Sequence, residues 1–279
     1  MTVQETPLEE RFQFGENWRR FLSVLNDERI ENAERAFVGV LGTDDLSGLS
    51  FLDIGSGSGL SSLVARRLGA KVRSFDFDPN SVGCTQELRR RYFPDDPDWV
   101  VTRGSVLDDS FMASLGTFDI VYAWGVLHHT GNMWKAIENA AARVAPGGRF
   151  FLAIYADRGR ESRAWWHVKR TYVKLPRMLQ PPFAMAAMLP YEAHNVLSAV
   201  RHRRPLDYLR LWTRYQDGRR GMSRWHDIED WVGGFPYEYA TVEAQQAFVE
   251  PRGFVTETVV QGKGIGCHEI VFRRLDPKP

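Results

Sequence analysis

The chain has 279 residues, of which 43% are hydrophobic and 25% charged, a composition typical of a globular protein with a sizeable core. Thirty-six Lys and Arg stand against thirty-five Asp and Glu, and this near balance argues against a nucleic-acid partner held over the whole surface. Two cysteines, Cys84 and Cys267, exclude a disulfide framework and are typical of reduced thiols in a cytoplasmic protein. Residues 1–11 show no signal-peptide core, and no apolar run reaches the roughly 20 residues of a transmembrane helix.

The N-terminal part is predicted to be helical. Trp18, Phe21, Leu22 and Leu25 recur with the spacing of one helix face, and similar spacing continues to residue 42. These helices need an apolar surface further along the chain to pack on. We therefore expect residues 1–47 to form a helical lid over a larger domain.

From residue 50 to 155 short apolar runs alternate with amphipathic stretches, a pattern that indicates βαβ units. Two more apolar runs close the chain, separated by a glycine-rich turn, and predict an antiparallel pair. The predicted strands are 51–54, 72–75, 99–102, 118–123, 149–155, 254–260 and 268–273. The predicted fold is α/β and Rossmann-like, with a seven-stranded, mostly parallel sheet, an antiparallel last strand and helices on both faces. One predicted helix ends at the turn Pro146-Gly147-Gly148.

The segment between the fifth and sixth strands is too long for a single crossover. It contains helical spacing, as in Trp165, Val168, Tyr172 and Leu175, and its first half is rich in Lys and Arg. We interpret residues 157–250 as a helical cap that recognises the substrate, inserted into a ligand-binding domain of residues 48–156 and 251–279. The basic balance of the cap leaves three alternatives open: a solvated face, a site for an anionic acceptor, or a patch for the membrane surface.

The first strand runs directly into the glycine-rich turn Gly55-Ser56-Gly57-Ser58-Gly59. Such glycines let backbone N–H groups approach a ligand at the carboxyl edge of a parallel sheet. A dinucleotide fingerprint would need glycine where Leu60 stands, which disfavours an NAD-dependent oxidoreductase as the alternative. Asp76 ends the second strand, where a carboxylate can accept hydrogen bonds from ribose hydroxyls, and Phe77 beside it could lie on a purine face.

These residues resemble the class I S-adenosylmethionine-dependent methyltransferases. Leu52-Asp53-Ile54 with the glycine turn is similar to the family's first motif, and further segments are similar to the motifs that follow in order. These segments are Asp76, Gly104 to Asp108, Phe118 to His129 and Val144 to Arg149. The resemblance covers residues 50–155 well and the last strand pair by pattern. The resemblance does not extend to the cap.

The resemblance implies S-adenosylmethionine as the cofactor and assigns a role to each matching position. The backbone of Gly55, Ser56 and Gly57 would approach the methionine part and Asp53 would orient its ammonium group. Asp76 would bind the ribose, and Ser105 and Val106 would flank the adenine, although many relatives have Asp in place of Ser105. Trp124 ends the fourth strand beside the same site. Family members often bring an N-terminal helix over the cofactor, and Asn17 and Trp18 are the residues expected to do so here.

Methyl transfer from a sulfonium is an in-line displacement that needs no metal, so we expect no metal cofactor. A hydroxyl acceptor needs a proton acceptor, and the candidates are His129, His128 and, from the cap, His226. The (N/D)PP(Y/F) segment of enzymes that methylate DNA adenine or protein glutamine is absent. The sequence therefore predicts a small-molecule acceptor, anionic or apolar, that is methylated most readily on oxygen. A phenol or quinone, a sugar and a lipid-linked compound are all open as acceptors. Methylation on nitrogen or carbon stays an alternative, as do a monomer and a homodimer.

Overall fold

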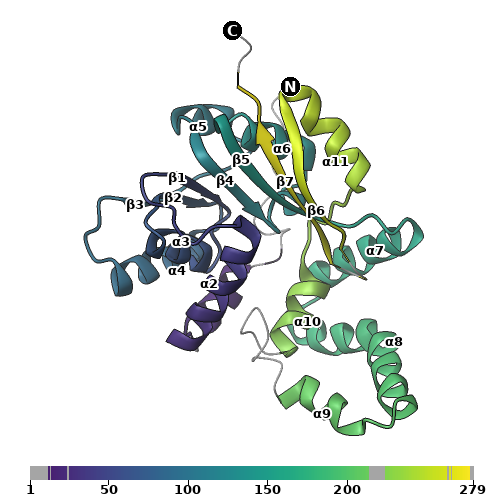
Figure 1. Ribbon diagram of the computed structural model, residues 1–279. Coiled ribbons are helices and arrows are strands. Elements are labelled where there is room, and N and C mark those ends of the chain that lie inside the picture. Colours follow the sequence, from purple (N-terminus) through teal and green to yellow (C-terminus); the bar gives the residue numbers. More distant parts are fainter. Residues whose placement is uncertain are drawn as a thin grey trace.

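The computed structural model of the protein describes residue 12 and residues 14–23, 25–213, 224–262, 264 and 266–276. Seven strands form one sheet in the order β3-β2-β1-β4-β5-β7-β6 (Figure 1). The strands are β1 (Ser50–Ile54), β2 (Lys71–Asp76), β3 (Trp99–Arg103), β4 (Phe118–Trp124), β5 (Val144–Tyr155), β6 (Phe254–Val260) and β7 (Cys267–Arg274). The first five pair in parallel, whereas β7 runs antiparallel between β5 and β6. The predicted fold class is confirmed.

Helices cover both faces of the sheet and extend beyond one of its ends (Figure 1). On one face α2, α3 and α4 pack over a core built around Phe51, and on the other α5, α6 and α11 pack over a core built around Phe150. The helices in chain order are α1 (Phe14–Ser23), α2 (Asp27–Leu41), α3 (Leu60–Arg67), α4 (Pro79–Tyr92), α5 (Asp109–Ser114), α6 (Met133–Ala141), α7 (Arg160–Lys174), α8 (Gln180–Arg201), α9 (Pro205–Thr213), α10 (Arg224–Gly233) and α11 (Val242–Val249).

The turn Pro146-Gly147-Gly148 lies in a different place from the predicted one. Helix α6 already ends at Ala141, and β5 starts at Val144 and includes the turn. The register to β4 shifts there, and a Cβ on Gly148 would lie 2.8 Å from the carbonyl oxygen of Asp119. The glycines thus allow a close backbone approach inside an irregular strand rather than ending a helix.

In the cap, α7, α8, α10 and the segment after α10 share a core of their own, apart from the two cores of the sheet. Its buried members are Trp165, Tyr172, Ala184, Met188, Ile228, Val232 and Tyr237. Helix α11 falls within the sequence boundaries 157–250 of the cap but packs on the sheet, because Val242 and Val249 join the core around Phe150. Helix α1 contacts α4 and α10 and so links the sheet to the cap.

Candidate functional site

The glycine-rich turn joins β1 to α3 at the carboxyl edge of the sheet. Gly55, Gly57 and Gly59 all have positive φ values, of 71°, 54° and 82°, which side chains with a Cβ rarely adopt. The N–H groups of Gly55 and Ser56 donate to the carbonyl oxygen of Phe75 at 2.9 and 3.1 Å, which fixes the turn to the end of β2. The turn is therefore a pre-formed backbone cradle beside the second strand.

Asp76 faces this cradle from the end of β2. One oxygen of its carboxylate, Oδ2, accepts the Gly57 N–H at 3.0 Å, and the other accepts the N–H of Asp78 at 2.9 Å. Withdrawal from water raises the pKa of this carboxyl to about 6, although part of the residue stays exposed. Phe77 follows it, half-buried, with its carbonyl oxygen accepting from Arg103 Nε at 3.3 Å.

Asp53 lies beneath the cradle and is 3% exposed. Its carboxylate accepts from Ser62 Oγ at 2.5 Å, Ser62 and Ser74 share a hydrogen bond of 2.6 Å, and Trp99 Nε1 donates to Ser74 at 3.0 Å. Burial raises the pKa of the Asp53 carboxyl to about 7. This interior network ties β1 to α3, β2 and β3, and it fits the alternative that Asp53 holds the turn together, while contact with an ammonium group stays a prediction.

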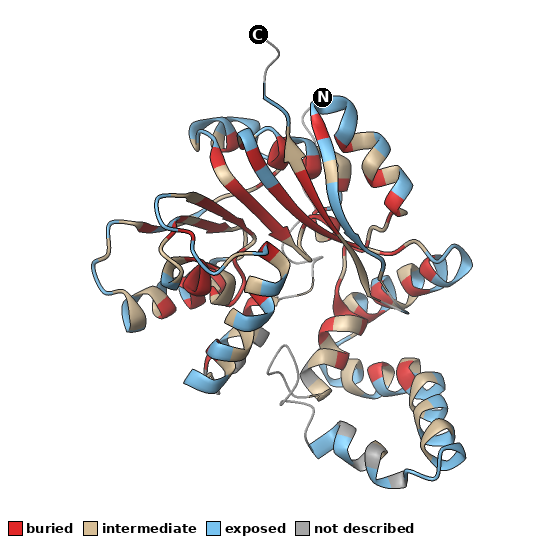
Figure 2. Cartoon of the chain, viewed as in Figure 1, coloured by how far each residue is buried: buried red, intermediate tan, exposed pale blue. Residues whose placement is uncertain are grey.

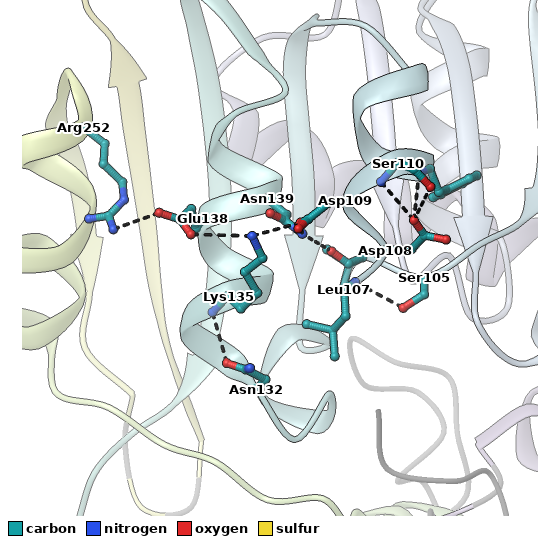
Figure 3. A network of polar contacts seen from close by, with 12 residues as sticks. Ser105, Leu107, Asp108, Asp109, Ser110, Asn132, Lys135, Glu138, Asn139 and Arg252 are labelled. Carbon is teal, nitrogen blue, oxygen red and sulfur yellow. Dashed lines mark hydrogen bonds and ion pairs between the residues drawn. The ribbon is translucent and has the colours of Figure 1, made fainter. Parts of the chain in front are cut away.

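The loop after β3 is held in place by a polar network that reaches α5 and α6 (Figure 3). Ser105 Oγ accepts the N–H of Leu107 at 3.1 Å, and Asn139 Nδ2 donates to the carbonyl oxygen of Val106 at 2.8 Å and to Asp109 at 2.9 Å. Val106 is buried and Ser105 half-buried. Both predicted adenine-side residues thus lie in one rigid turn near the cradle's edge of the sheet.

Helix α1 brings Trp18 onto the glycine-rich turn. A Cβ built on Gly57 would lie 3.0 Å from Trp18 Nε1, so the indole packs directly against that glycine. The helix is attached to α4 through the Gly15 N–H, which donates to Asp78 Oδ2 at 3.0 Å. The backbone of Asn17 belongs to α1, but its side chain lies outside the described residues.

Trp124, at the end of β4, lies at the same carboxyl edge of the sheet. Its ring stacks on Tyr122 with centroids 5.3 Å apart and planes 7° from parallel. Just beyond it, Val126 packs on the cradle so closely that a Cβ on Gly55 would lie 2.2 Å from its Cγ2. Gly55 is therefore needed for close approach as well as for its backbone conformation.

The histidine pair follows β4 in the short helix Leu127–His129. His128 is fully buried, with its ring 4.0 Å from that of Tyr155. His129 is half-buried. Its Nδ1 lies 2.7 Å from the carbonyl oxygen of Pro236, and its ring lies 4.9 Å from that of Phe14. Because a carbonyl only accepts, Nδ1 donates the proton and Nε2 of the neutral ring carries the lone pair.

His226, the third candidate, lies in α10, but its side chain is outside the described residues. Among the described residues, the segment after α10 also contacts the histidine pair. Pro236 contacts His129 as described, and Glu238 donates its backbone N–H to the carbonyl oxygen of His128 at 3.0 Å. The Glu238 carboxylate accepts the Met133 N–H at about 3.0 Å, which fixes the start of α6.

A buried lysine that was not predicted from the sequence lies against Tyr155, whose ring packs on both histidines. Lys169 is fully buried, and its Nζ lies 4.0 to 6.0 Å from the ring centroids of Trp231, Tyr237, Tyr155 and Trp165 and donates to the Trp231 carbonyl oxygen. Burial lowers the pKa of this ammonium to about 7. Its burial could have been predicted from its spacing, because Lys169 follows Trp165 by four residues and therefore lies on the apolar face of α7.

The described part of the chain contains no group of three His, Cys, Asp or Glu side chains that could hold a metal ion. Over the same residues, no helix is both long and apolar enough to cross a bilayer.

Comparison with known proteins identifies the family. Residues 19–189, more than half of the chain, match the family model described as a methyltransferase domain. A ubiquinone biosynthesis O-methyltransferase of Methylobacterium sp. (strain 4-46) is 33% identical over 119 residues, which are 40% of this chain and 43% of that protein. The corresponding protein of Paramagnetospirillum magneticum is 29% identical over 149 residues, 52% of this chain and 56% of the relative. The matches thus span about half the length of these relatives.

Solved structures agree in fold. Magnesium protoporphyrin IX methyltransferase from Synechocystis PCC 6803, with bound S-adenosylhomocysteine, superposes with a TM-score of 0.54 at 14% identity over 93% of both chains. An N-methyltransferase from Bradyrhizobium japonicum WM9, in complex with the same product, gives 0.51 at 14% identity over 94% of this chain and 99% of that one. The chain therefore belongs to the methyltransferase-domain family and has the class I S-adenosylmethionine-dependent fold that its sequence motifs indicate.

Proposed function

We propose that this protein transfers a methyl group from S-adenosylmethionine to an oxygen atom of a small-molecule acceptor. We base the choice of oxygen on the hydrogen bond between His129 and Pro236, because it keeps a proton on Nδ1 and so makes Nε2 the proton acceptor whenever the ring is neutral. The family match supports methyl transfer, and the O-methyltransferase names of the matched relatives support oxygen as the acceptor atom.

The residues around the glycine-rich turn fit the cofactor. At Gly55 and Gly57 the positive φ values and the close contacts of Val126 and Trp18 exclude a Cβ, so the turn presents backbone alone at these two positions. Asp76 presents a carboxylate beside it for ribose hydroxyls, and the turn at Ser105 and Val106 provides the adenine side. Asp53 supports the cradle from beneath, and Trp18 covers it. When bound, S-adenosylmethionine supplies an electrophilic methyl group on sulfur.

The acceptor side is formed by aromatic rings between the sheet and the cap. Phe14 and Tyr155 lie 4.9 and 5.5 Å from the ring of His129, and Trp231 and Tyr237 lie 5.1 and 5.2 Å from Tyr155. Such a wall favours a flat or apolar acceptor and excludes water from it. In such a site His129 Nε2 would accept the hydroxyl proton of the acceptor, and the Pro236 carbonyl oxygen would stabilise the imidazolium that results.

The direct test is methyl transfer from deuterium-labelled S-adenosylmethionine to matched acceptor pairs that differ only in carrying a hydroxyl or an amino group, such as a catechol and the corresponding aminophenol. We expect labelled methyl ether from the hydroxyl compounds, identified by mass spectrometry and by the NMR shift of the methyl group. Methylation of the amino group alone in every pair would contradict the proposal.

A further inference from the structure

Helix α8 exposes an apolar stripe to solvent. Met185, Leu189, Val196 and Val200 follow one another at intervals of four, seven and four residues, which places them on one side of the helix. Their exposed fractions are 63%, 65%, 39% and 63%. The cap packs on a different side of α8, where Ala184 and Met188 are buried.

The stripe continues beyond α8. Further exposed apolar side chains precede it, flank it and follow it in α9: Met178, Leu179, Leu197, Leu206 and Trp212. Both helices lie beyond α7 and α10, on the side of the cap away from the sheet (Figure 1), and exposed residues recur along α8 (Figure 2). Proteins that stay free in solution rarely expose so much contiguous apolar surface, so the stripe indicates a partner.

Basic side chains border the stripe at both ends. Lys174 and Arg177 are exposed before α8, and Arg201, Arg203 and Arg204 are exposed at its end. Residues 174–213 contain only two acidic side chains, and one of them, Glu192, is already bound by Arg224 and by Tyr208. The border of the stripe is therefore strongly positive.

We propose that the α8–α9 stripe is a docking surface for an anionic lipid bilayer. The apolar side chains suit the acyl boundary, while the arginines and lysine suit acidic headgroups, which is the arrangement of helices that lie in a membrane interface. A second copy of the chain fits less well, because a two-fold contact would bring the same basic borders together. This surface is separate from the cofactor cradle, and the proposal does not depend on the acceptor.

The test is sedimentation of the full-length protein with large vesicles of phosphatidylcholine, with and without phosphatidylglycerol. We expect the anionic lipid to raise the partition coefficient about tenfold or more, and added salt to reverse much of this gain. Charge reversal in the double variant Arg201→Glu/Arg204→Glu should remove the preference for phosphatidylglycerol. The assay contains neither cofactor nor acceptor, so its failure would leave the proposed reaction untouched.

Leu189→Asp tests the apolar part, and Leu275→Asp is the matched control, since Leu275 is 48% exposed far from the cap, just after β7. Leu189→Asp should lower vesicle binding about tenfold, whereas the control should bind like the wild type, both with an unchanged melting temperature. Equal binding of Leu189→Asp and wild type would overturn the proposal, as would wild-type binding that ignores phosphatidylglycerol. A dimer that Leu189→Asp dissociates, without vesicle binding, would assign the stripe to a second copy instead.

Discussion

His129 and Pro236 are joined by a hydrogen bond of 2.7 Å across 107 residues of chain, from the end of β4 to the segment that leaves the cap. In the proposed mechanism this contact makes the cap part of the reaction site, because it sets which nitrogen of the imidazole holds the proton. His129→Ala should therefore lower kcat about 10²- to 10⁴-fold, with cofactor affinity nearly unchanged. Steady-state kinetics and calorimetry measure the two quantities.

The pH profile adds a second check on His129. In the wild type kcat should fall toward acid pH as the imidazole takes up a proton, and this limb should be missing in His129→Ala. His194→Ala, on the exposed side of α8, is the control and should behave like the wild type. Turnover of His129→Ala within a few-fold of the wild type would remove His129 as the proton acceptor.

Asp76→Asn should weaken cofactor binding by about 1–3 kcal/mol, because a charged acceptor for the ribose hydroxyls is lost. The wild-type affinity should also decrease as the pH falls through about 6, where the Asp76 carboxyl becomes protonated, and the variant should lack this dependence. Asp95→Asn, at an exposed loop position, serves as control. Identical calorimetric titrations of Asp76→Asn and wild type would show that Asp76 lies outside the cofactor site.

Gly57→Ala should reduce cofactor affinity at least about tenfold, because the residue has a φ of 54° and its Cβ would press on Trp18 at 3.0 Å. Gly83→Ala is a useful contrast, since nothing lies within 4 Å of a Cβ there and Gly83 is inside α4. The second variant should bind cofactor normally and gain about 0.5–1 kcal/mol in unfolding free energy. Equal affinities in both variants would mean that the cradle at Gly57 does not touch the cofactor.

Lys169 should make stability depend on pH above neutrality. Its pKa of about 7 in the folded protein lies below the ordinary lysine value of 10.5, so the unfolded chain binds more protons between these limits. The unfolding free energy therefore gains a few kcal/mol from this group as the pH rises from about 7 to about 10. Denaturant titrations of Lys169→Met should lack this increase, whereas Lys174→Met, on the exposed end of α7, should keep it. The same slope in both variants would refute the assignment.

The fold could be predicted from the sequence because the patterns that indicate its strands and turns are local. Each of the first five strands is a short apolar run, and the glycine-rich turn and Asp76 mark the carboxyl edge of the sheet without any tertiary information. The one misplaced turn, at Gly147 and Gly148, was misassigned because glycines that allow a close backbone approach look the same as glycines that end a helix.

Only the cofactor side of the candidate site could be predicted from the sequence, because the acceptor side depends on contacts between distant segments. Nothing near His129 indicates that Pro236 will bind it, and the position of Trp18 over the glycine-rich turn was expected from the family resemblance and not from any local pattern. Lys169 was overlooked because lysine normally marks a solvated helix position, and only its place on the apolar face of α7 distinguishes it. Tertiary packing determines whether such side chains are buried and what they contact, and sequence spacing alone does not.

The central claim is that the cradle between Gly55 and Asp76 holds S-adenosylmethionine, and calorimetric titration of the purified protein tests it most directly. We predict saturable one-to-one binding of S-adenosylmethionine and S-adenosylhomocysteine, with dissociation constants on the order of 10 µM or tighter, and no binding of NAD. Absence of heat with both sulfur compounds, together with saturable binding of NAD, would contradict the claim.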